Sequence, residues 1–273
     1  MAAYRLLALD MDGTVLTSDK HVSPRTRQAL RDLCSKGVAL ALATGRNVVE
    51  LSEYREELSF VPYGVLASGA IAYHFAKREV LLSTPIPTEA VLTTVTIALE
   101  EGGIPFLSCV DGTRARKADA ERLDECGLHG YRMMYEQIYE PVEDLAAWVA
   151  AHPGKVVKLD IYHVKNEGCL RIRDRIVEAD APIEVWSSEP GCMECTALGV
   201  NKSVGLRALA ERLGIAMEEI VAVGDGGNDL AMLKSVGMPV AMGNASREVC
   251  DVARLIVADN DHDGIVELID RLF

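Results

Sequence analysis

The stretch that most constrains the fold lies at the amino terminus, where an apolar run of strand length ends in Asp10. Asp12 follows two residues later, and Gly13 and Thr14 then turn the chain. In an α/β sheet, ligands bind outside the carboxyl ends of the strands, so a carboxylate pair at this place is a candidate metal or catalytic site. Asp and Gly also favour turns, so these residues alone are equally compatible with a simple turn.

Strand and helix patterns alternate after this opening. Residues 24–36 have the leucine spacing of a helix, and the continuous apolar run 38–43 predicts a strand buried on both faces. We expect a helix over about 47–57 and a strand ending near 64–67. This order implies a parallel sheet with right-handed crossovers.

The pattern is less regular from a hairpin at 71–82 to residue 196. The alternation of buried strands and helices then returns. In the middle we expect helices over 88–101, 117–126, 142–151 and 166–179 and strands over 104–109, 155–162 and 183–187. In the last part we expect helices over 202–213, 228–235, 246–253 and from 263, and strands over 220–223, 238–241 and 254–257. The sequence therefore predicts an α/β fold: a Rossmann-like parallel-sheet core from residues 1–84 and 197–273, with an α+β domain inserted at 85–196.

Composition excludes several classes of protein. The chain is 49% hydrophobic with a net charge of −13, which predicts a globular protein and argues against nucleic acid, whose phosphates need Lys and Arg. No apolar run approaches the roughly 18 residues of a membrane span, and no secretion signal is visible. The seven cysteines are scattered; the Cys192–Cys195 pair lies in a strand-like pattern, which favours buried structural thiols over zinc or redox chemistry. We therefore expect a cytoplasmic protein without nucleic-acid or membrane partners.

Polar residues follow three of the expected parallel strands. Asp10, Thr44 and Asp225 stand at these ends, and Lys202 begins a helix. Carboxylates gathered at one sheet edge repel each other unless a cation lies between them, and Mg²⁺ prefers oxygen ligands. A hydroxyl and an ammonium group can hold phosphate oxygens, one carboxylate can attack phosphorus, and a second can move the proton. These groups together suit Mg²⁺-assisted phosphoryl transfer.

Residues 224–229, Gly-Asp-Gly-Gly-Asn-Asp, are the most informative stretch after the opening one. A glycine-rich turn is the simplest interpretation, but two aspartates at the end of a buried strand make it less favoured. The spacing fits neither a P-loop nor an EF-hand. Asp225 can reach a metal, and Asn228 and Asp229 can start the next helix and orient the metal's ligands.

Taken together, these motifs resemble the four ordered motifs of the haloacid dehalogenase-like (HAD) phosphatases. The four motifs are Asp10-Met11-Asp12-Gly13-Thr14, Ala43-Thr44-Gly45-Arg46, Lys202 and the 224–229 stretch. Two later stretches, residues 241–245 and Asp263-Gly264, are similar to the Cof-type subgroup of this family. That subgroup carries a large α+β cap, which determines substrate specificity, between the second and third motifs. The insert at 85–196 occupies this place.

The resemblance implies a role for each matching residue. Asp10 would be the nucleophile and an Mg²⁺ ligand, and Asp12 would be the general acid/base and give its backbone carbonyl to the metal. The implied phosphate-binding residues are Thr44, Gly45, Lys202 and Asn228, and the implied further metal residues are Asp225 and Asp229.

The chain departs from the family pattern at two places, neither of which touches the chemistry. Ser68-Gly69 stands where the family often has Asn-Gly, and Cys250 lies near the place of a frequent lysine. In the insert, Arg114, Arg116 and Lys117 could face an anionic substrate, but a solvated loop is favoured.

The resemblance implies an Mg²⁺-dependent phosphatase that acts on a small phosphorylated metabolite, with sugar phosphates among the candidates, through an aspartyl-phosphate. The alternative is a sugar phosphotransferase or phosphomutase that uses the same site. A non-catalytic sensor of phosphorylated metabolites is less favoured, because none of the five expected groups is missing. The sequence indicates neither a monomer nor a homo-oligomer in particular.

Overall fold

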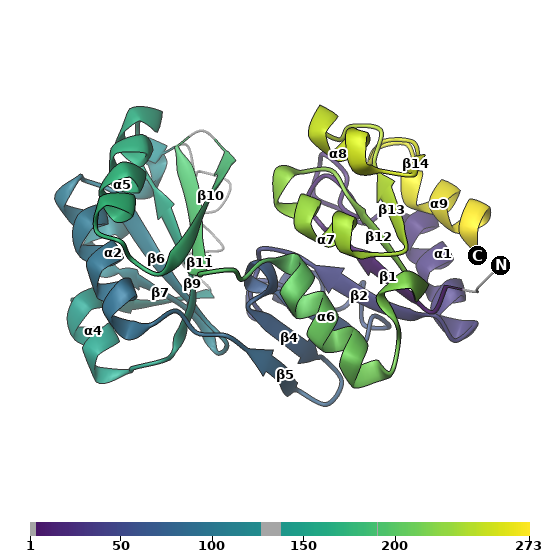
Figure 1. Cartoon of the computed structure of the whole chain (residues 1–273), viewed down its shortest axis with the longest axis horizontal. Coiled ribbons are helices and arrows are strands. Elements are labelled where there is room, and N and C mark those ends of the chain that lie inside the picture. Colours follow the sequence, from purple (N-terminus) through teal and green to yellow (C-terminus); the bar gives the residue numbers. More distant parts are fainter. Residues whose placement is uncertain (1–3, 127–137, 190) are drawn as a thin grey trace. The chain divides into compact units, whose positions relative to one another are not determined.

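The computed structural model describes residues 4–126, 138–189 and 191–273 (Figure 1). The chain divides into two compact units. Unit 1 comprises Met1–Gly45, Ser52–Leu82 and Asn201–Phe273, and unit 2 comprises Arg46–Leu51 and Ser83–Val200.

Unit 1 is built on an eight-stranded sheet with the order β14-β13-β12-β1-β2-β3-β4-β5. Its strands are β1 (Leu6–Leu9), β2 (Ala39–Ala43), β3 (Tyr63–Leu66), β4 (Ile71–His74), β5 (Glu79–Ser83), β12 (Ile220–Gly224), β13 (Met238–Ala241) and β14 (Leu255–Ile256). The central strand β1 pairs in parallel with β12 and β2, and Leu9 lies opposite both Val223 and Leu42. The carboxyl ends of these three strands therefore meet at one edge of the sheet.

Helices cover both faces of this sheet. They are α1 (Pro24–Ser35), α6 (Lys202–Leu213), α7 (Leu230–Ser235), α8 (Arg247–Val252) and α9 (Gly264–Leu272). Leu6 and Ala8 of β1 belong to the same buried cluster as Leu206 of α6 and Met232 of α7. The alternate residues of β1 point to the other face, since side chains alternate along a strand. Helices α1 and α9 lie next to each other in unit 1 (Figure 1).

Unit 2 has a six-stranded sheet with the order β10-β11-β9-β6-β7-β8. Its strands are β6 (Ile104–Cys109), β7 (Gly112–Arg116), β8 (Tyr139–Val142), β9 (Val156–Tyr162), β10 (Ile183–Glu189) and β11 (Cys192–Ala197). Helices α2 (Thr88–Glu100), α4 (Leu145–Ala151) and α5 (Asn166–Glu178) pack against strands of this sheet. Most of its pairings are antiparallel, as expected for an α+β domain.

The predicted α/β class is confirmed, but the helix expected over 47–57 is wrong. The chain forms turns there and a short 3₁₀ helix, η1 (Ser52–Tyr54). A first helical turn does begin, because Asn47 Oδ1 accepts the backbone N–H of Glu50 at 3.1 Å and the Glu50 carboxylate accepts that of Asn47 at 2.9 Å. Glu50 also accepts the hydroxyl of Thr113 at 2.8 Å. The side chains of this turn, which itself belongs to unit 2, thus bond within that unit, and the expected helix is absent.

Other expected elements agree within a few residues, with one change of type. Residues Lys117–Cys126, expected as an α-helix, form the 3₁₀ helix η3. Cys192 and Cys195 are buried in β11, as the strand-like pattern predicts, and their odd spacing places them on opposite faces of the strand. Throughout the three described stretches, we find no helix with the length and apolar character needed to cross a membrane.

Candidate active site

The residues that follow β1, β2 and β12 lie together at one edge of the unit 1 sheet. The backbone N–H of Asp10 donates to the carbonyl of Val223 at 3.1 Å, which continues the β1–β12 pairing by one residue. Thr44 donates its N–H to Val65 at 2.9 Å and is buried. Parallel pairing therefore brings Asp10, Thr44 and Asp225 to the same edge although they are far apart in the sequence.

Lys202 joins two of the aspartates. Its Nζ lies 2.6 Å from Asp10 Oδ1 and 2.6 Å from Asp229 Oδ1, and all three side chains are buried. Lys202 is the first residue of α6, and Asn201 caps this helix by accepting the N–H of Ser203 at 3.0 Å. The cap fixes where the helix starts and hence where the ammonium group stands.

The second oxygen of Asp229 is held by backbone. Asp229 Oδ2 accepts the N–H groups of Asp225 and Gly226, each at 3.1 Å. This arrangement needs the short 3₁₀ turn η6 (Gly227–Asp229), which folds the carboxylate back onto the end of β12. Asp229 is therefore a buried carboxylate, both of whose oxygens accept hydrogen bonds, and it orients the loop carrying Asp225.

Burial and neighbouring charges shift the ionisation of the site. Burial and the negative charge of Asp229 raise the pKa of Asp10 well above its ordinary value, against the opposing effect of Lys202. Burial, then Asp229, also raises the pKa of Asp225. The pKa of Lys202 is raised because Asp10 and Asp229 outweigh its own burial. A further positive charge next to these groups would favour ionised carboxylates.

The donor set fits a metal ion. One oxygen each of Asp10, Asp225 and Asp229 lies within 4.8 Å of the others. Three carboxylates face one ammonium group here, so a cation would balance the excess negative charge. Oxygen ligands of this kind suit hard divalent cations such as Mg²⁺, Mn²⁺ or Ca²⁺.

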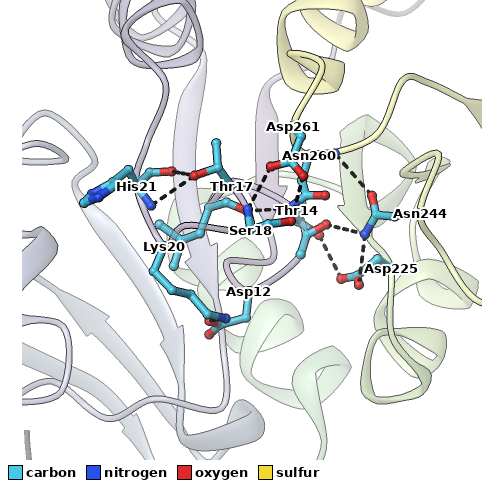
Figure 2. Close-up of polar contacts among 12 residues, drawn as sticks. Asp12, Thr14, Thr17, Ser18, Lys20, His21, Asp225, Asn244, Asn260 and Asp261 are labelled. Atoms are coloured by element: carbon cyan, nitrogen blue, oxygen red, sulfur yellow. Dashed lines mark hydrogen bonds and ion pairs between the residues drawn. The ribbon is translucent and has the colours of Figure 1, made fainter. Parts of the chain in front are cut away.

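Both oxygens of Asp225 are also oriented by neutral groups (Figure 2). Thr14 donates its hydroxyl to Asp225 Oδ1 at 3.1 Å, and Asn244 donates its amide to Asp225 Oδ2 at 3.4 Å. The same Asn244 nitrogen lies 2.9 Å from the carbonyl of Gly13. Thr14 and Asn244 lie within the sequence motifs, but the motifs alone predicted no role for them. Their position in the loops that follow strands β1 and β13 is the signal that could have found them.

Asp12 occupies a different environment from Asp10. Its carboxylate forms an ion pair with Lys20, whose Nζ lies 2.8 Å from Asp12 Oδ1, and both side chains are partly exposed (Figure 2). The acidic cluster of the described residues contains Asp10, Asp225 and Asp229 but not the Asp12 carboxylate. The two aspartates of the opening motif are thus separated into a buried and an accessible group.

The remaining predicted site residues lie on loops of unit 1. Gly45 follows Thr44 and is partly exposed, whereas Asn228 is exposed on η6 beside Asp229. The carbonyl of Thr44 accepts the N–H of Ser68 at 3.1 Å. Ser68 is buried and has a left-handed backbone, with φ of 55°.

The insert's basic residues do not form a solvated loop, so that expectation is wrong for two of the three. Arg114 and Arg116 lie on β7. Arg114 is buried and pairs with Asp111 at 2.9 Å and Glu140 at 2.8 Å. Arg116 pairs with Asp119 at 2.6 Å, whereas Lys117 is exposed near Glu143. Carboxylates of unit 2 already bind both arginines, which makes them weak candidates for an anionic ligand.

The chain is similar to known proteins over nearly its whole length. A family model described as haloacid dehalogenase-like hydrolase matches residues 7–269. The Bacillus subtilis 5-amino-6-(5-phospho-D-ribitylamino)uracil phosphatase YcsE is 27% identical over 271 residues, covering 97% of this chain and 94% of that protein. The Escherichia coli pyridoxal phosphate phosphatase YbhA is 28% identical over 267 residues, covering 97% of each. The crystal structure of a haloacid dehalogenase-like hydrolase from Bacteroides thetaiotaomicron matches with a TM-score of 0.85 and 27% identity, covering 99% of this chain and all of that one.

Proposed function

The chain belongs to the haloacid dehalogenase-like hydrolases, and we propose that it is an Mg²⁺-dependent phosphatase acting on a small phosphorylated metabolite through an aspartyl-phosphate on Asp10. The observation that carries this proposal is the convergence of Asp10, Asp225 and Asp229 around the ammonium group of Lys202. Relatives named as phosphatases of a ribityl-aminouracil phosphate and of pyridoxal phosphate support the reaction class.

Each residue has a role in this reaction. Asp10 attacks phosphorus and the ester oxygen leaves, which forms the aspartyl-phosphate. Asp12 donates a proton to the leaving oxygen and later takes one from the water that hydrolyses the intermediate. Thr44, Gly45, Lys202 and Asn228 bind the phosphate oxygens.

Asp10, Asp225 and Asp229, with the backbone carbonyl of Asp12, would hold Mg²⁺, which supplies positive charge against the phosphoryl oxygens. Thr14 and Asn244 orient Asp225 for this purpose, since residues that hydrogen-bond a ligand fix its geometry.

We assign substrate selection to the insert, residues 85–196, within unit 2. Relatives that align over nearly the whole chain are named for chemically different phosphomonoesters. This supports a shared phosphoryl site with a variable specificity domain.

The first test is turnover of p-nitrophenyl phosphate and of a panel of phosphorylated metabolites, with and without Mg²⁺. We expect Asp10→Asn to lose essentially all turnover, because an amide cannot form the acyl phosphate. Asp270→Asn, which changes an exposed aspartate on α9, is the matched control and should keep wild-type rates. Retained turnover in Asp10→Asn would contradict the assignment of the nucleophile. Product analysis with excess sugar separates hydrolysis from transfer to a sugar acceptor.

A further inference from the structure

The tight turn that follows the opening motif places a lysine where glycine is usual. Thr17 N–H donates to the carbonyl of His21 at 2.8 Å, and Lys20 N–H donates to the carbonyl of Thr17 at 2.8 Å. These bonds close the turn and give Lys20 a φ of 61°. The left-handed region is unfavourable for residues with a Cβ, and Gly, Asn or Asp normally fill it.

The carboxyl-terminal loop of unit 1 fixes this turn in place (Figure 2). Asp261 accepts the N–H of Ser18 at 2.8 Å and its hydroxyl at 2.6 Å. The side chain of Asn260 donates to the carbonyl of Leu16 at 2.9 Å. The backbone just before Lys20 is therefore anchored at two points, Leu16 and Ser18.

The side chain of Lys20 reaches back to Asp12 across eight residues. Its Nζ lies 2.8 Å from Asp12 Oδ1, and the side chains are 52% and 39% exposed, respectively. Ion pairs with this exposure contribute little to stability. The stability that this ion pair contributes therefore does not explain why a lysine occupies a position with a strained backbone. Strained backbone of this kind collects at functional sites.

We propose that Lys20 is a positioning residue, whose ammonium group holds the Asp12 carboxylate in the orientation needed for proton transfer. The inference rests on the proposed function, in which Asp12 is the general acid/base. Proton transfer requires a group within hydrogen-bond reach of the reacting oxygen. A carboxylate that samples several orientations is in reach for less of the time, which lowers the rate of turnover. Lys20 itself gives and takes no proton in the reaction.

Three variants separate the charge of Lys20 from its backbone. Lys20→Met keeps the side-chain length and the strain but removes the ammonium group, and we expect kcat to fall by about tenfold to a hundredfold with KM nearly unchanged. Lys20→Gly should lose turnover similarly while its melting temperature stays equal to or above wild type, because the strain is relieved. Lys20→Arg keeps the charge and should retain most turnover.

Arg78→Gly is the matched control. Arg78 is exposed in the β4–β5 turn of the same unit, and its φ of 52° carries the same strain without a link to the site. We expect its melting temperature to stay equal or rise and its kcat to stay unchanged. If Lys20 had only a structural role, turnover and melting temperature would fall together in the Lys20 variants. That result would overturn the proposal.

A crystal structure of Lys20→Met gives a readout that does not need turnover. The proposal predicts that the Asp12 carboxylate moves or becomes disordered in the variant. An unchanged Asp12 rotamer, or wild-type kcat in Lys20→Met, would overturn the positioning role. A wild-type enzyme without phosphatase turnover would instead refute the proposed function, and the position of Asp12 would still decide whether Lys20 holds it.

Discussion

At the scale of single residues, Gly13 shows how closely the opening motif approaches its partner. Its φ is 77°, and a Cβ built on it would lie 2.4 Å from Asp225 Oδ2. No side chain fits between this turn and the carboxylate. The turn therefore reaches Asp225 only because residue 13 is glycine, and the same turn gives its carbonyl to Asn244 at 2.9 Å.

We expect Gly13→Ala to weaken both the fold and the metal site. Left-handed backbone costs a residue with a Cβ about 1–2 kcal/mol, and displacement of Asp225 should lower Mn²⁺ affinity by roughly tenfold or more. Gly37→Ala is the control, because Gly37 has a φ of 89° with nothing within 4 Å of a built Cβ. It should lose similar stability in urea unfolding without losing Mn²⁺ affinity by calorimetry. Equal Mn²⁺ affinity in the two variants would contradict this account of Gly13.

At the scale of elements, strand β9 carries a buried charged cluster in unit 2. Lys158 Nζ lies 2.8 Å from Asp160 Oδ1 and 3.5 Å from Glu194 Oε2 of β11. Glu50, from the 46–51 segment, also acts on both Lys158 and Asp160. Burial is the largest effect on Asp160, and it raises the pKa of this carboxyl from 3.8 to about 7 although Lys158 opposes the shift. One ammonium group cannot neutralise three carboxylates, so a proton on Asp160 relieves the excess charge.

This cluster predicts a pH dependence of stability. Because the pKa of Asp160 is higher in the folded chain than in the unfolded chain, folding takes up a proton between these two values. The resulting stabilisation is complete below about pH 4 and is lost as the pH rises through about 7, at up to about 1.4 kcal/mol per pH unit.

Urea unfolding of wild type and Asp160→Asn between pH 5 and 8 measures this contribution. Asparagine is neutral throughout, so the stability of the variant relative to wild type should rise with pH. Asp174→Asn, at an exposed position on α5, should show no such trend. A constant difference between wild type and Asp160→Asn across this range would show that Asp160 titrates normally.

At the scale of the whole molecule, the chain passes from one unit to the other more than once along the sequence. Unit 2 takes its main part from residues 83–200 and a short segment, 46–51, that directly follows Thr44 and Gly45. The proposed metal and phosphoryl residues all belong to unit 1. A metal ion should therefore stabilise unit 1 directly.

We expect Mg²⁺ to raise the melting temperature of the protein by mass action. A ligand at a hundred times its dissociation constant stabilises the folded state by about 2.7 kcal/mol. Calorimetry in Mg²⁺ and after chelation measures the shift, and Asp225→Asn should reduce it. Asp32→Asn, which changes an exposed residue of α1, should leave the shift intact. An equal Mg²⁺ shift in wild type and Asp225→Asn would place the metal elsewhere.

The sequence alone determined the fold class and most of the strands and helices of unit 1, because buried parallel strands require continuous apolar runs and helices require regular spacing. It also indicated that Asp10, Thr44 and Asp225 would meet, since the ends of parallel strands share one edge. Tertiary structure alone decided how the two opening aspartates differ: Asp10 is buried against Lys202, and Asp12 is paired with Lys20. It also decided the conformation of residues 47–57, which form turns and a short 3₁₀ helix instead of the expected helix, with Asn47 and Glu50 bonded to Thr113. Contacts between residues far apart in the sequence leave no local pattern, so only the folded chain shows them.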